Sequence, residues 1–147
     1  MEPHATALAD AVEAALPGWV DRSVTRIVVA WTGEAPDAGT VDAAQEAGRR
    51  AAAEVGGQVR ALLAADIDDQ WTTPLSLLRA AVRYPTAVLR DAGVPPVERD
   101  PFRERLEPDD LYDLSPASFA DVDPALTEPG MVWGAAKALA HRRRHMP

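Results

Sequence analysis

The clearest periodic pattern of apolar and polar positions lies in residues 73–96. Leu75, Leu78 and Val82 recur at i, i+3 and i+7, which places them on one face of a helix. The stretch opens with a Thr-Pro pair, which is typical of a helix start. The threonine oxygen can accept a hydrogen bond from a backbone N–H of the first turn, and proline at the first helical position loses nothing by lacking an N–H. The pattern therefore predicts a helix beginning at Thr73.

A proline divides this stretch. Pro85 has no N–H and its ring clashes with the preceding turn, so we expect a bend at Tyr84-Pro85. Helical spacing resumes afterwards, and Gly93 is a natural residue just past a helix C-terminus. The prediction is two short helices followed by an extended segment at 94–97.

The N-terminal half shows weaker patterns. Residues 5–16 carry an apolar stripe and are predicted to form a helix that ends at Pro17-Gly18. Residues 19–32 are ambiguous, because their β-branched run suits a strand while Val20, Val24, Ile27 and Trp31 fit a helical face. Helix is favoured, since no partner strand is evident.

Residues 33–40 are predicted to be a loop, with Thr40 capping an alanine-rich helix over 41–65. Gly56-Gly57 in its middle is unfavourable in a helix. Either the helix breaks there, or another helix packs closely against the bare backbone.

The C-terminal half is acidic and proline-rich. Residues 98–128 contain ten acids and three arginines, a local charge of −7. Asp100-Pro101, Ser115-Pro116 and Asp123-Pro124 each resemble the start of a single helical turn. Apolar residues lie irregularly between them: Leu106, Leu111, Tyr112, Leu114, Phe119, Val122 and Leu126. We expect a segment that wraps the helical body, followed by a last helix over 129–145.

These patterns predict an all-α fold: a compact bundle of five to seven helices with a Pro-rich, acidic wrapping segment. The 147 residues suit one domain, with N-terminal helices in 1–72 and the rest in 73–147. Apolar content is 47% but aromatic content only 5%, which predicts helices packed through small side chains.

Composition also narrows the function. Cysteine is absent, which excludes disulfides and thiolate metal sites, and no apolar run is long enough to cross a membrane. The acidic N-terminus is unlike a signal peptide, so we expect a cytoplasmic protein. A net charge of −8 argues against broad binding of nucleic acid or anionic membranes.

The tightest acidic cluster is Asp66, Asp68 and Asp69. An EF-hand loop is excluded, because Trp71 stands where the loop needs glycine and Leu77 where it needs glutamate. A Mg²⁺ site in a metal-dependent enzyme is an alternative, but a polar linker is favoured.

The C-terminal HRRRH run offers two other sites. His141 and His145 have the spacing of a helical metal pair, yet no glutamate adjoins them and three arginines lie between, so a solvated helix end is favoured. Arg142, Arg143 and Arg144 could bind phosphate, which makes a nucleic-acid-associated regulator a second alternative.

No nucleophile, P-loop or dinucleotide motif is present, and no cofactor is indicated. We therefore expect a non-enzymatic protein-interaction or regulatory module with a protein partner; a homodimer stays open. Arg79, Arg83 and Arg90 on one side and the acidic wrapping segment on the other are the expected recognition surfaces, and Trp71 is an expected interface anchor.

The runs PLSLLRAAVRYPTAVLRDAGVPPVERDPF and DDLYDLSPASFADVDPALTEPGMVWGAAKA resemble uncharacterised proteins of high-GC actinobacteria. The resemblance covers roughly residues 60–142. It implies that the C-terminal half is one unit, and it transfers no functional residues.

Overall fold

The computed structural model describes residues 3–64, 78–97, 111–114 and 119–126. These ranges are mostly helical and contain no strand, so the all-α prediction is confirmed for them. The predicted number of helices and the wrapping segment depend on residues outside these ranges and stay predictions.

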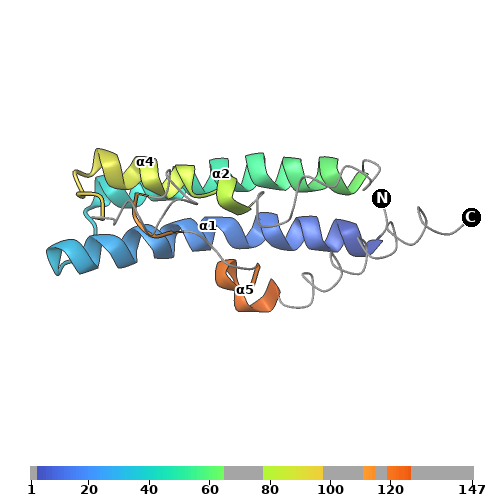
Figure 1. Cartoon of the computed structure of the whole chain (residues 1–147), viewed down its shortest axis with the longest axis horizontal. Helices are drawn as coiled ribbons and strands as arrows, with labels where there is room; N and C mark the ends of the chain where they lie inside the picture. The colour runs from blue at the N-terminus through green and yellow to red at the C-terminus, as the bar shows by residue number, and fades with distance from the viewer. Residues whose placement is uncertain (1–2, 65–77, 98–110, 115–118, 127–147) are drawn as a thin grey trace, which may run out of the picture.

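Two long helices form an antiparallel hairpin, α1 (Pro3–Thr32) and α2 (Ala38–Ala64) (Figure 1). Helix α4 (Arg83–Asp91) packs against both of them. The short helix α5 (Phe119–Val122) and the 3-10 turn η1 (Pro124–Leu126) contact α1.

Helix α1 runs through Pro17, so the predicted helix end at Pro17-Gly18 is wrong. The residues on both sides of the proline belong to one buried stripe, which continues at helical spacing. Its apolar members are Leu8, Ala9, Val12, Leu16, Trp19, Val20, Val24 and Val28. The proline costs about 3 kcal/mol in a helix interior, and burial of this stripe against α2 opposes that cost. The helix favoured for 19–32 is confirmed as the second half of α1, although Trp31 leaves the buried face.

The two long helices approach closely where Pro17 of α1 meets Gly48 of α2. A Cβ on Gly48 would lie 2.9 Å from the Pro17 Cα and 3.2 Å from its carbonyl oxygen. No side chain fits in that space, so α2 needs glycine here. On either side Ala44, Ala47 and Ala51 are buried, as expected for helices packed through small side chains.

Gly48→Ala should therefore lower the free energy of unfolding by about 1–3 kcal/mol, because the helices must separate to admit the methyl group. Gly57→Ala is the matched control, since a Cβ there meets nothing within 4 Å. That variant should gain about 1 kcal/mol from helix propensity. Urea unfolding of both variants checks the pair; equal gains would contradict the close approach.

Gly56 marks a second approach of the two helices. The carboxyl carbon of Glu13 would lie 3.0 Å from a Cβ at this position, so the side chain rests on bare backbone. The same carboxylate accepts a hydrogen bond of 2.7 Å from Arg60, which also pairs with Asp10. Helix α2 is therefore not broken at Gly56-Gly57. Of the two predicted alternatives, close packing is the one observed, and the Glu13 side chain of α1 packs against the backbone of Gly56.

Helix α2 is capped by Asp37, not by Thr40 as predicted. The Thr40 amide donates to Asp37 Oδ1 at 2.8 Å, and the Val41 amide donates to the Asp37 carbonyl at 3.0 Å. The hydrogen bond from Thr40 lowers the pKa of Asp37 below its ordinary value. A carboxylate is favoured at the positive end of a helix dipole, so Asp37 takes the capping position. Thr40 therefore lies three residues further on, inside the first turn.

The predicted bend lies at residues 81–82, before Tyr84-Pro85, so its predicted position is wrong. Pro85 occupies the first turn of α4, where an N–H is not needed. The Tyr84 amide donates to the Ala81 carbonyl at 3.2 Å, which supplies the bond that Pro85 cannot. Proline thus shifts the bend toward the N-terminus.

The end of α4 agrees with the prediction. Gly93 has a φ of +81°, and its amide donates to the Arg90 carbonyl at 3.0 Å. The Val94 amide donates to the Leu89 carbonyl at 3.0 Å. This pair of bonds is the Schellman arrangement, and buried Val94 and Leu89 accompany it.

Thr86 of α4 is buried, and its hydroxyl has no hydrogen-bond partner among the described residues. Thr86→Val keeps the shape and removes the unsatisfied group, so it should raise the free energy of unfolding by about 1 kcal/mol. Thr86→Ala, which also removes a methyl group, should gain less. Thermal unfolding of both variants tests this; a clear loss in the valine variant would show that the hydroxyl is satisfied.

Candidate functional site

The site is built on one face of α1. Trp19, Arg22, Ser23 and Arg26 follow the spacing i, i+3, i+4 and i+7, so they lie along one side of the helix. Trp19 and Ser23 are buried, each 6% exposed, whereas both arginines are exposed. The face therefore has an aromatic and hydroxyl floor between two guanidinium groups.

The opposite wall comes from the segment 111–114. The buried Tyr112 hydroxyl donates to the Val94 carbonyl at 2.8 Å, and the Val97 amide donates to the Leu111 carbonyl at 2.9 Å. These bonds tie the segment to the chain that leaves α4. Asp113 takes the left-handed conformation, with a φ of +57°, which aspartate tolerates better than most residues. Leu114 beside it is buried.

Helix α5 closes the site from a third side. Arg22 donates a hydrogen bond of 2.6 Å to the carbonyl of Val122, the last residue of α5. The final carbonyls of a helix lack partners within the helix, so a guanidinium satisfies one of them. Asp123 follows and accepts from the Ala125 amide at 2.9 Å, which opens η1 as predicted for Asp123-Pro124.

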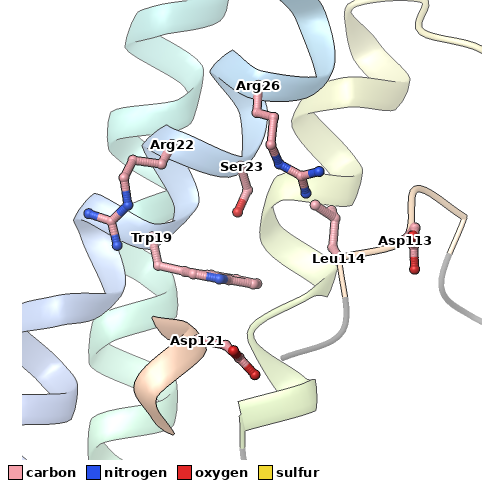
Figure 2. Close-up of a pocket in the computed structure, with 7 residues that line it drawn as sticks. All are labelled: Trp19, Arg22, Ser23, Arg26, Asp113, Leu114 and Asp121. Atoms are coloured by element: carbon pink, nitrogen blue, oxygen red, sulfur yellow. The ribbon is translucent and has the colours of Figure 1, made fainter. Parts of the chain in front are cut away.

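Together these elements border an open pocket of about 360 Å³. Its lining residues are Trp19, Arg22, Ser23, Arg26, Asp113, Leu114 and Asp121. Figure 2 shows Arg26 and Ser23 directed from α1 toward the space between Trp19 and Leu114. Asp113 lies beyond Leu114, and Asp121 approaches from α5. The pocket is thus lined by two guanidinium groups, a hydroxyl and two carboxylates around an apolar floor.

Arg22 and Arg26 have different roles in this pocket. Arg22 already binds the α5 carbonyl. Within the described ranges, Arg26 forms no hydrogen bond or ion pair, and neither does the Asp113 carboxylate. A guanidinium is a strong donor to planar anionic groups, so Arg26 is the group available to a ligand.

One of the three arginines of the expected recognition surface, Arg83, forms an ion pair within the chain. Arg83 pairs with Glu54 of α2 and lies 5.9 Å from the centre of the Tyr84 ring. Arg83 thus joins α4 to α2. Arg90 is exposed in the last turn of α4, where a cation is favoured by the helix dipole. Arg79 lies in the turn of helix before the bend.

Several predicted residues lie outside the described ranges. They are Asp66, Asp68, Asp69, Trp71, His141, Arg142, Arg143, Arg144 and His145. Where side chains are described, no group of three or more acidic or histidine residues is placed to hold a metal ion. None of the described helices is long and apolar enough to cross a membrane.

Sequence reasoning missed the pocket residues. The pocket residues of α1 share a helical spacing: Trp19, Arg22, Ser23 and Arg26. Because a helix end was predicted at Pro17-Gly18, this spacing could not be joined to the buried stripe that precedes the proline. Asp113 and Asp121 lie far from α1 in the sequence, within the acidic segment 98–128. No local signal pairs them with α1.

Comparison of the chain with protein-family models, curated proteins and solved structures finds no match. The resemblance to actinobacterial proteins therefore stays a prediction.

Loss of the Arg22 hydrogen bond should loosen α5. Arg22→Ala should lower the free energy of unfolding by about 1 kcal/mol and speed amide exchange in residues 119–126. Arg26→Ala is the matched control, because it removes the same kind of side chain one turn away without touching Val122. Hydrogen exchange resolved by residue checks this, and equal protection of α5 in both variants would argue against the clamp.

Proposed function

We propose that this protein is a non-enzymatic interaction module that binds a segment of a protein partner in the pocket between α1, α5 and the segment 111–114. The proposal rests on the position and the bonding of Arg26. Its guanidinium lines the pocket and is bonded to no group in the described ranges. The buried Trp19 and Leu114 side chains border the pocket beside it.

The chemistry of the pocket supports recognition better than catalysis. Among the described lining residues, Ser23 supplies a hydroxyl and none is a histidine that could act as its base. Guanidinium, indole and carboxylate groups are frequent contributors to protein interfaces. The pocket is also open at the surface, where an extended or helical segment could lay one side chain into it.

The other functions expected from the sequence remain proposals. The surface formed by Arg79, before the bend, and by Arg83 and Arg90 of α4 would be a second contact area. The nucleic-acid and metal-enzyme alternatives rest on residues outside the described ranges. A cytoplasmic setting is proposed from the acidic, cysteine-free composition.

Selection from a displayed random-peptide library tests the proposed function. The full chain should enrich a defined set of peptides, and Arg26→Ala should lose them. Arg50→Ala is the control, since Arg50 is exposed on α2 and pairs with Glu46 outside the pocket. No enrichment by the wild-type chain, or the same peptides from the Arg26 variant, would refute the proposal.

A further inference from the structure

We infer that the partner segment carries an acidic and a basic side chain on either side of an apolar one. Arg26 pairs with the acid, and Asp113 pairs with the base. The inference rests on the proposed function and adds the chemistry of the segment that the pocket binds.

The charges that line the pocket balance, and they are separated by element. Both guanidinium groups, of Arg22 and Arg26, belong to α1. Both carboxylates come from the other walls, Asp113 from the segment 111–114 and Asp121 from α5. A lining with two formal positive and two formal negative charges has no net attraction for an anion or for a cation. It is complementary to a ligand that carries both charges, separated in the same way.

Two of these four groups already have interactions. Arg22 donates to the Val122 carbonyl, which orients its guanidinium and leaves its charge unchanged. Asp121 has an interaction of its own. Among the residues that the structure describes, Arg26 and Asp113 form neither a hydrogen bond nor an ion pair. These two side chains therefore keep their full hydrogen-bonding capacity for a ligand.

The positions of Arg26 and Asp113 set the order of the side chains that they bind. Both are exposed, and no ion pair joins them in the described part of the chain. In the view of Figure 2, the Leu114 side chain lies between them. Leu114 and Trp19 are buried and border the pocket. An apolar side chain of the partner that contacts these two residues places its neighbours next to the two charges, which gives the order acid, apolar, base.

Peptides from the library selection test the inference. The enriched set should share an acidic and a basic residue that flank an apolar one. In the tightest peptide, the acid and the base are each changed to glutamine, and binding to the full chain is measured by fluorescence anisotropy. Each change should weaken binding about two- to fivefold, as expected for the loss of one exposed ion pair.

Double-mutant cycles then assign each charge to its partner. Arg26→Gln should abolish the effect of removing the acid and keep the effect of removing the base. Asp113→Asn should do the reverse, and asparagine tolerates the left-handed backbone at this position. The control Arg50→Ala, outside the pocket, should leave both effects unchanged.

Three results would overturn the inference. If the selected peptides lack the basic residue, or if its effect persists in Asp113→Asn, the inference fails while the interaction function stands. The same holds if Arg26→Gln and Asp113→Asn are coupled in the urea unfolding of the free chain, because the two groups would then pair with each other. If the selection yields no peptide, the inference and the proposed function both fail.

Discussion

The contact between Pro17 and Gly48 is the constraint on which the described structure depends. Proline in the middle of α1 removes a helix hydrogen bond, and glycine in the middle of α2 lowers helix propensity. Each residue is unfavourable in its own helix. Together they let two backbones approach within a distance that no side chain at position 48 would allow. The buried alanines on either side extend this approach along the hairpin.

The continuity of α1 through Pro17 creates the candidate site. Trp19, Ser23 and Arg26 have fixed relative positions because they belong to a helix held against α2 on both sides of the proline. The helix also presents one face to α2 and another to α5 and the segment 111–114. A helix that began anew after Gly18 would have had no such restraint on its direction.

The arginines of the described ranges divide by what they bind. Arg60 joins the two long helices through Asp10 and Glu13, and Arg83 joins α4 to α2 through Glu54. Arg22 holds the end of α5. These three groups connect elements, which is a structural role. Arg26 lines the pocket and, among the residues that the structure describes, forms no such bond.

The amino-acid sequence by itself determined the helical class, the Gly93 helix end and the turn at Asp123-Pro124. Each follows from local spacing or from one residue's backbone preference, which acts the same way in any fold. Only the tertiary structure decided that α1 continues past Pro17, that Gly48 contacts Pro17, and that Asp113 lines the same pocket as Arg22 and Arg26. Those outcomes depend on burial against partners distant in sequence, and packing energy of that kind outweighs the local preference of a single proline.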